Sequence, residues 1–456
     1  MTLQDASRLP YTDHYLLGAS GRGTLLPYVV SGHGVFLESE DGRQFLDGSS
    51  GALAASLGHG RTDMADALRE QAASVAFAHR TQLRNRPTEE LASIIAHWAP
   101  GDLERCMFVS SGSDANELAL GLTIRYWAAR GESGRTAVLA RDRSYHGATL
   151  GALSLTGLEE RRKAMTPLLL SIARFPSPRP TMDQSSERQL LKDVEAAFAA
   201  VGVEKLAAVV IEAVSGTSGG AIVPPRSYTE RIQELCRETG ALLIVDEVMT
   251  GFGRTGRAFA CDLLGLEPDI VTFGKGISGG YAPLAGVIVR PGVADLLDEV
   301  GGVGLGHTYM NTPLSSAVGL AASRIILDSV FLASVEARGL EVRDQLRALQ
   351  SKHPDKIAAV RGVGLMNAVE VTSVEKDRTL GNDRLLTAMR EAGLLLYPAT
   401  PHSADDSGTH IVMVAPPLVI TAGEVSELVR RFALGLEKYV EGRGRRTDAC
   451  NANDQR

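Results

Sequence analysis

An aspartate and a lysine follow two short apolar segments near the middle of this 456-residue chain. Asp246 comes directly after Ala241–Val245, and Lys275, which lies between two glycines, closely follows Ile270–Phe273. Both segments are rich in branched residues, as strands buried on both faces of a parallel sheet are. Open α/β sheets bind their ligands at the carboxyl ends of such strands. We therefore expect Asp246 and Lys275 to face one site.

These two residue types suit the chemistry of one cofactor. A lysine flanked by glycines and backed by an aliphatic strand loses hydration, which lowers its pKa and makes it a nucleophile for a carbonyl. A buried aspartate at a strand end can lie against a ring nitrogen and keep it protonated. Enzymes that use pyridoxal phosphate (PLP) need both groups, a lysine for the Schiff base and an acidic partner for the pyridinium. The pair Asp246 and Lys275 thus predicts a PLP site.

A segment of small polar residues, SSGSD at 110–114, lies between an expected strand, Arg105–Val109, and an expected amphipathic helix, Ala115–Ala129. Helix N-termini bind phosphate through their free backbone N–H groups and their dipole. The alternative is a simple N-cap by Ser113 or Asp114. The segment alone leaves both interpretations open, and the lysine downstream favours phosphate binding.

A dinucleotide site is the rival interpretation of the same region, because Gly251, Gly253 and Gly256 satisfy G-x-G-x-x-G after a strand. That fingerprint requires the glycines to open a helix at once, whereas Arg254–Cys261 has no helical apolar spacing. It also requires an acid at the end of the following strand, whereas Asp269 precedes its strand. These departures disfavour nucleotide binding.

Two long motifs carry a resemblance to a known family. LLIVDEVMTGFGRTG, followed by PDIVTFGKGISGGYAPLAGV, resembles the class III, omega-type, aminotransferases of the fold-type I PLP enzymes, and the resemblance covers about residues 20–440. It implies that Lys275 forms the internal Schiff base (aldimine) with PLP, that Asp246 pairs with the pyridine nitrogen, and that Val248 packs on one face of the ring. These roles agree with the chemistry expected from the residues themselves.

Two further motifs extend the implied phosphate site. SSGSDANE is similar to the family's phosphate-binding motif, which implies cofactor contacts from Ser111, Gly112 and Ser113. Thr308, in the glycine-rich segment GGVGLGHTYMNTP, stands where the family supplies a phosphate-binding hydroxyl from the neighbouring subunit. The resemblance thus implies a homodimer whose active sites are shared between subunits. A loop whose hydroxyl is solvated is the alternative for Thr308.

Two other motifs imply contacts around the cofactor ring. The YHG motif implies that Tyr145 stacks on the pyridine, with His146 nearby, although aromatic residues at strand ends are more often part of a core. EAVSGTSGGAIVPP resembles the family's EPxxGxxGxxxPP and departs from it at Ala213. It implies that Glu212 faces the substrate side of the cofactor, and a capping or loop carboxylate is the alternative.

The substrate motifs depart from the family's patterns. Members that act on ornithine-type or gamma-amino acids carry HGRT, whereas this chain has HGAT, with Ala148. Others have an arginine shortly before PPL, whereas here that region has none and contains Tyr397. An α-carboxylate would therefore lack its usual bidentate partner, unless Arg84, Arg86 or the partner subunit binds it. Dialkylglycine decarboxylases have a glutamine in the loop that here contains Ala52, which disfavours decarboxylation.

From this resemblance we expect a transaminase with ping-pong kinetics. It would move an amino group from a primary amine or omega-amino compound with an apolar body to a keto acid, pyruvate or 2-oxoglutarate. The alternative on the same cofactor and fold is an epimerase or aminomutase, which keeps the amino group on the substrate.

The remaining pattern predicts an α/β fold of two domains. Expected strands near residues 105, 136, 206, 242, 270 and 286 alternate with helices or loops, which is typical of a mostly parallel sheet flanked by helices. This large PLP-binding domain would span 59–329. A hairpin in Gly34–Asp47 and the short strands after residue 330 predict a small α+β domain from both chain ends, 1–58 and 330–440. The polar tail 441–456 is expected to be disordered.

Composition narrows the partners and the compartment. The formal net charge is −7, and the one short basic run lies near the C-terminus, which disfavours nucleic acid. The four cysteines are far apart in the sequence, as in reduced proteins. We find no secretory signal and no apolar stretch of the roughly 20 residues that a membrane span needs. We therefore expect a cytoplasmic enzyme without a membrane partner.

Overall fold

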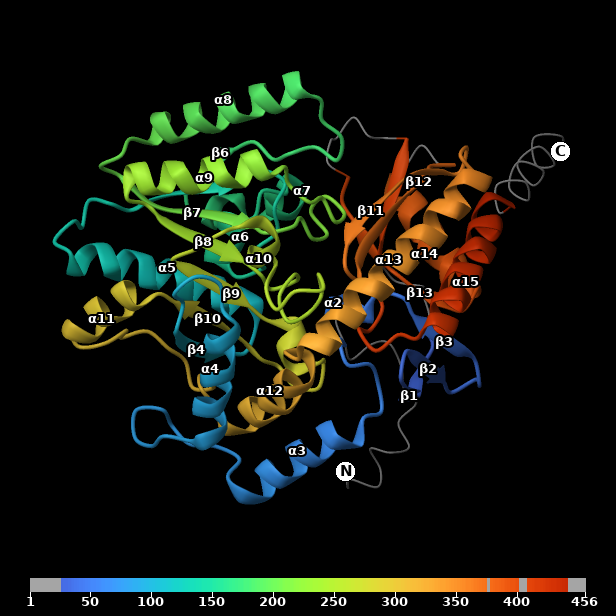
Figure 1. Cartoon of the computed structure of the whole chain (residues 1–456), viewed down its shortest axis with the longest axis horizontal. Coiled ribbons are helices and arrows are strands. Elements are labelled where there is room, and N and C mark those ends of the chain that lie inside the picture. Colours follow the sequence, from blue (N-terminus) through green and yellow to red (C-terminus); the bar gives the residue numbers. More distant parts are fainter. Residues whose placement is uncertain (1–25, 375–377, 402–407, 442–456) are drawn as a thin grey trace.

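The computed structural model describes residues 26–374, 378–401 and 408–441. All but one residue of the tail expected to be disordered, 441–456, lies outside these ranges. In the described part the central sheet has seven strands, in the order β4-β10-β9-β8-β7-β5-β6 (Figure 1). They are β4 (Arg105–Val109), β5 (Ala137–Arg141), β6 (Ala173–Phe175), β7 (Leu206–Glu212), β8 (Leu242–Asp246), β9 (Ile270–Phe273) and β10 (Ala285–Val289).

The direction of these strands confirms the predicted α/β class. Strands β5 to β9 pair in parallel, whereas β10 is antiparallel to both β4 and β9. The expected strands all occur within a residue or two of their predicted bounds. The edge strand β6 was not expected, because its three residues, Ala-Arg-Phe, form no apolar run.

Helices cover both faces of the central sheet, which is why its middle strands read as continuous apolar segments. Every residue of β7 and β8 is buried. In β7, Val209 and Ile211 face one core and Ala208 and Val210 face the other, as the alternation of strand side chains requires. The first face is covered by α4 (Arg86–Trp98), α8 (Gln184–Val201), α9 (Arg226–Thr239) and α12 (Pro313–Ile326), and the second by α5 (Gly112–Ala129) and α11 (Pro291–Glu299).

The two ends of the chain form a second, smaller unit (Figure 1). One sheet has the order β1-β2-β3-β13 and joins the N-terminal strands to β13, which runs parallel to β3. The other has the order β11-β12-β15-β14. The strands are β1 (Val29–His33), β2 (Phe36–Ser39), β3 (Gln44–Asp47), β11 (Ile357–Val363), β12 (Met366–Thr372), β13 (Leu394–Leu395), β14 (Tyr397–Ala399) and β15 (Thr409–Val414). Helices α13 (Ser329–Lys352), α14 (Arg378–Glu391) and α15 (Ala422–Glu441) pack beside them.

One predicted strand of this unit, Leu394–Tyr397, was wrong as a single element. Leu395 pairs with Asp47 in the first sheet, whereas Tyr397 pairs with Met413 in the second. The chain passes from one sheet to the other between these residues. The residues at the division, LLLY, form one apolar run, so the sequence gives no sign of it.

The remaining elements connect these layers. They are α2 (Ser50–Leu53), α3 (Thr62–Ser74), α6 (Leu150–Leu155), α7 (Glu159–Arg162), α10 (Ala260–Leu264) and the 3₁₀ helices η1 (Lys163–Leu168) and η2 (Lys275–Ser278). The long helical pattern after Pro313 is divided into α12 and α13, as expected. Among the described helices none alone is long and apolar enough to cross a bilayer, and one pair, α12 and α13, passes that test by length and composition only, with a bend of 71°.

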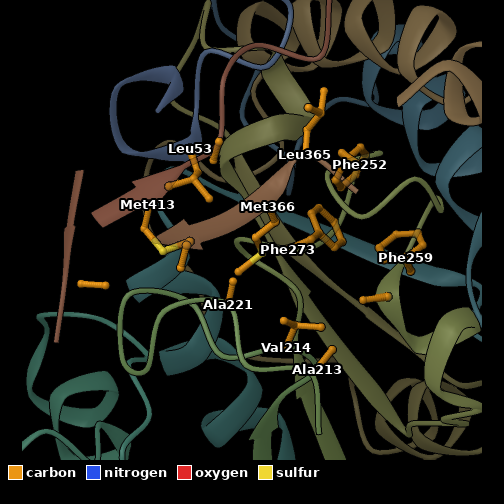
Figure 2. Close-up of a cluster of buried hydrophobic side chains, with 14 of the residues drawn as sticks. Leu53, Ala213, Val214, Ala221, Phe252, Phe259, Phe273, Leu365, Met366 and Met413 are labelled. Carbon is orange, nitrogen blue, oxygen red and sulfur yellow. The ribbon is translucent and has the colours of Figure 1, made fainter. Parts of the chain in front are cut away.

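A buried apolar cluster joins the large sheet to the small unit (Figure 2). Phe273, at the end of β9, and Phe252 contribute from the large unit, and Met366 of β12 and Met413 of β15 contribute from the small one. The rings of Phe252 and Phe273 meet edge-on, with centroids 5.6 Å apart. This packing fixes the small unit over the carboxyl ends of the central strands, where the candidate site lies.

Candidate active site

A cavity of about 320 Å³ lies at the carboxyl ends of β7, β8 and β9. Residues from the small unit, Tyr397 and Pro398, contribute to its wall. The sequence-predicted residues that line it are Gly112, Ser113, Tyr145, His146, Glu212, Asp246, Val248 and Lys275. The structure thus brings together predicted residues that are far apart in the chain, from Gly112 to Lys275.

Lys275 begins η2 in a left-handed backbone conformation, with φ 45°. Such a conformation is uncommon for residues other than glycine and is concentrated at functional sites. Burial lowers the pKa of the Lys275 ammonium to about 8, against opposing contributions from the carboxylates of Asp246 and Glu212. A neutral, nucleophilic amine is therefore accessible near physiological pH, which agrees with the expectation from its flanking glycines.

This pKa predicts the pH dependence of Lys275 in the protein freed of small molecules. Its reaction with a small aldehyde, trapped with borohydride, is expected to be half-maximal near pH 8, because the neutral amine forms above the pKa. Lys192 of α8, which is exposed, is the internal control. Peptide mapping across a pH series measures both, and coincident profiles would contradict the assigned environment.

Asp246 is held by three donors at the end of β8. Its Oδ2 atom accepts a hydrogen bond from Asn116 Nδ2 at 2.9 Å and lies 2.8 Å from His146 Nδ1. Its Oδ1 atom accepts from the backbone N–H of Val248 at 2.9 Å. The hydroxyl of Thr272 donates to Asn116 Oδ1, which fixes the orientation of the amide. The carboxylate is therefore buried and oriented before any ligand arrives.

Asn116 is a site residue that the sequence analysis missed. It lies one helical turn after Gly112 in α5, and its amide also donates to the backbone carbonyl of His146 at 2.8 Å. The i, i+4 spacing places both residues on one face of α5, so the signal was present in the motif SSGSDANE. The imidazole of His146 is buried, and its Nε2 atom has no hydrogen-bond partner among the described residues.

The N-terminus of α5 begins three residues earlier than predicted, at Gly112 rather than Ala115. Ser111 is the N-cap and accepts from the backbone N–H of Asp114 at 3.2 Å, so the expectation of a cap by Ser113 or Asp114 was wrong. The helix can begin with glycine and serine because the Ser111 hydroxyl accepts a hydrogen bond from one of the free N–H groups of the first turn. The shift leaves Ser113 in the cavity wall, with its hydroxyl accepting from Ala148 N.

Glu212 lines the cavity as an ion pair that is almost fully buried. Its Oε2 atom lies 2.7 Å from a guanidinium nitrogen of Arg141, which is only 1% exposed. The other oxygen accepts a hydrogen bond from the backbone N–H of Gly216 at 3.0 Å. Glu212 therefore also bonds to the loop that follows it, which was the alternative role considered from the sequence. Arg141 was missed because the sequence pattern ended β5 one residue too early and gave no sign of its distant partner. Breaking such a pair would leave a buried charge uncompensated.

Tyr145 and Val248 also line the cavity, and burial raises the pKa of the Tyr145 phenol. Two other predicted site residues lie outside its lining. Ser111 is exposed immediately before the first turn of α5, and Thr308 is exposed on the loop before α12. The structure of one chain therefore does not bring Thr308 to the site.

The arginines suggested for a substrate carboxylate do not line the cavity. Arg84 is exposed and paired with Glu89, and Arg86 is the first residue of α4. Ala52, in α2, does line it. A different arginine, Arg161 of α7, lies in the cavity wall. It was missed because it belongs to a charged run, EERRK, of the kind that usually forms a solvated surface.

The fold and site define an α/β enzyme with a buried lysine and an oriented aspartate at the ends of neighbouring strands. A family model, aminotransferase class-III, matches residues 18–436. The chain therefore belongs to the class III aminotransferases, and it is a transaminase of fold type I.

Similar proteins agree with this assignment. The chain is 34% identical over 420 residues to an uncharacterised aminotransferase, YodT, of Bacillus subtilis, covering 89% of this chain and 94% of that one. It is 30% identical to the putrescine–pyruvate aminotransferase of Pseudomonas aeruginosa, over 92% of this chain and 91% of the relative. The crystal structure of an (S)-enantioselective omega-transaminase from Thermomicrobium roseum matches with a TM-score of 0.86 and 33% identity, over 93% and 96% of the two chains.

Proposed function

We propose that this transaminase uses PLP to move an amino group from a primary amine or omega-amino compound to a keto acid, pyruvate or 2-oxoglutarate, by ping-pong kinetics. The observation that carries the proposal is that Lys275, whose pKa is about 8, and the oriented carboxylate of Asp246 line one cavity. The relative from Pseudomonas aeruginosa is described as using pyruvate, and a relative from Halomonas elongata as using 2-oxoglutarate.

The residues present fit PLP. The first turn of α5, with Gly112 and Ser113 in the cavity wall, offers backbone N–H groups to a phosphate. Asp246 would hold the pyridine nitrogen, Tyr145 and Val248 would contact the ring, and Lys275 would bind the aldehyde carbon. When bound, PLP supplies an electron-withdrawing ring that stabilises negative charge on the substrate carbon.

The protein's own part in the reaction is to position groups and move protons. Lys275, once free of the cofactor, can take a proton from the substrate carbon as a neutral amine and return it elsewhere. Asp246 would keep the ring cationic, and His146 and Asn116 hold Asp246 in place. Glu212, held by Arg141, places a carboxylate at the substrate side of the cavity.

Gly112 supplies a test of the proposed cofactor site. A Cβ atom at this position would lie 2.7 Å from Val248 Cγ1, so alanine would displace either Val248 or the helix start. Overpacking of this size costs about 1–3 kcal/mol, and we expect Gly112→Ala to weaken PLP binding roughly 10- to 100-fold. Equilibrium dialysis measures this. Gly134→Ala, at a position with nothing within 4 Å of the added atom, is the control and should bind PLP as the wild type does.

We also propose a homodimer in which Thr308 binds the cofactor phosphate of the partner subunit. Support comes from apolar surface near Thr308: Phe77 is 45% and Tyr309 is 65% exposed, and their rings pack edge-on at 6.0 Å. Such aromatic surface is typical of an interface. Sedimentation should give a dimer, and Thr308→Ala should weaken PLP binding. A monomer that binds PLP with full affinity would contradict the shared site.

We also propose a cytoplasmic location, based on the dispersed cysteines, which cell fractionation would test.

The function is tested by a screen of amine donors with pyruvate and with 2-oxoglutarate, using the holoenzyme. A keto or aldehyde product from the donor, together with the amino acid formed from the acceptor, supports transamination. Initial rates at several concentrations of both substrates should give parallel double-reciprocal lines. Conversion of a donor into an isomer that keeps its nitrogen, without any need for the keto acid, would favour an epimerase or aminomutase.

A further inference from the structure

Arg161 is a cation in the wall of the candidate site that no described group neutralises. It belongs to α7 and lines the same cavity as Lys275. In the described residues, no ion pair or side-chain hydrogen bond engages its guanidinium. The nearby acid Glu160 lies 3.8 Å from Arg143 instead. Arg141, by contrast, forms an ion pair with Glu212 at 2.7 Å. An arginine of this kind can accept an anionic ligand without first breaking an internal pair.

Burial differs along the wall of the cavity. Arg161 is exposed, whereas Glu212 and Asp246 are only 5% and 6% exposed. Burial raises the pKa of the Tyr145 phenol, and the charge of Arg161 opposes this increase. Arg161 therefore lies on the solvent side of the cavity, apart from the buried end that holds Asp246. An anion bound there would not be attached to the reacting carbon.

The rest of the substrate side is suited to a short apolar chain. Leu158, Val214, Met249 and Pro398 contribute apolar surface to the cavity wall. Guanidinium groups bind carboxylates through two parallel hydrogen bonds, which gives orientation as well as affinity. The cavity therefore combines an apolar wall with a cation that lies apart from the reacting lysine.

We infer that Arg161 binds the distal carboxylate of an omega-amino acid donor, and so selects donors that carry an acid at the end opposite the reacting amine. The inference rests on the proposed transaminase function. It gives the site a carboxylate partner in place of the arginine that is absent from the HGAT segment, where Ala148 stands.

The test compares two donors that differ only at the distal end, 5-aminopentanoate and pentylamine. In the holoenzyme we expect Arg161→Met to lower kcat/KM for 5-aminopentanoate roughly 10- to 100-fold, the loss that removal of a hydrogen bond to a charged group produces. The value for pentylamine should stay unchanged. Lys163→Met removes an equal charge from an exposed position two residues away that does not line the cavity, and is the matched control. It should change neither value.

A second measurement separates binding from turnover. Glutarate carries carboxylates but no amine, and calorimetric titration of the holoenzyme should show weaker binding to Arg161→Met than to the wild type and the Lys163→Met control. Equal losses with both donors would overturn the inference and assign Arg161 to the keto acid or to the fold. Equal binding of glutarate to all three proteins would also overturn it. If the wild type transaminates pentylamine and Arg161→Met changes kcat/KM for neither donor, the proposed function stands and the inference fails. If it transaminates no amine, the proposed function itself fails.

Discussion

Replacing Lys275 with alanine is expected to lower the turnover of any amine donor by at least about 10⁴-fold, the upper range for loss of a general acid–base group. The reason is that, in the proposed function, the same side chain binds the cofactor and moves the proton. Its burial, which lowers its pKa to about 8, makes both roles available near neutral pH. Turnover should be measured with the donor and acceptor pair that the wild type uses best.

The control for this prediction is Lys192→Ala, which removes an exposed lysine from α8 and should retain full activity. Borohydride reduction of the holoenzyme followed by peptide mapping supplies an independent readout. The cofactor label should be found on Lys275 in the wild type and should be absent from this position in the variant. Label on another lysine of the wild type, or substantial turnover by Lys275→Ala, would refute the assigned role.

The second large effect is expected from Asp246→Asn. This change keeps the shape of the side chain but removes the negative charge that is intended for the pyridinium. We expect turnover to fall roughly 10²- to 10³-fold, as when a preorganised electrostatic partner is removed from an active site. The hydrogen bonds from Asn116 and Val248 and the contact with His146 keep the carboxylate in place in the wild type. Single-turnover kinetics with the amine donor measures the effect on the chemical half-reaction.

Asp193→Asn is the matched control, because Asp193 is exposed on α8, where its carboxylate accepts a hydrogen bond from Gln189. It should leave the half-reaction unchanged. A shifted absorbance of the bound cofactor in Asp246→Asn but not in the control would show that the ring itself has lost its partner. Full activity of Asp246→Asn with an unchanged spectrum would refute the assignment of Asp246 as the partner of the pyridine nitrogen.

The central sheet could be predicted because burial on both faces makes its strands continuous apolar runs, as in β8 and β9. The residues at the ends of those strands, Asp246 and Lys275, stood out because charged side chains are rare beside such runs. The edge strand β6 did not stand out, since it is short and contains an arginine. The division between β13 and β14 left no trace because both strands are apolar.

The parts of the site that could not be predicted depend on contacts between distant segments. Asn116 and Asp246 are 130 positions apart, and Arg141 and Glu212 are 71 positions apart. Pattern and propensity act over a few residues, so they give no information on such partners. Arg161 shows the same limit, because its place in the cavity wall follows from the position of α7 and not from its charged neighbours.

The left-handed backbone of Lys275 has a consequence for engineering the protein. Glycine adopts φ 45° without steric strain. Burial of the Lys275 ammonium also costs folding free energy, as its lowered pKa shows. This cost in folding free energy is fully present below pH 8, where the buried amine is charged, and it is absent above pH 10.5, the ordinary pKa of lysine. Selection of a variant library for thermal stability alone would therefore favour glycine at this position and would give a more stable but inactive protein. Stabilisation campaigns should hold residue 275 constant.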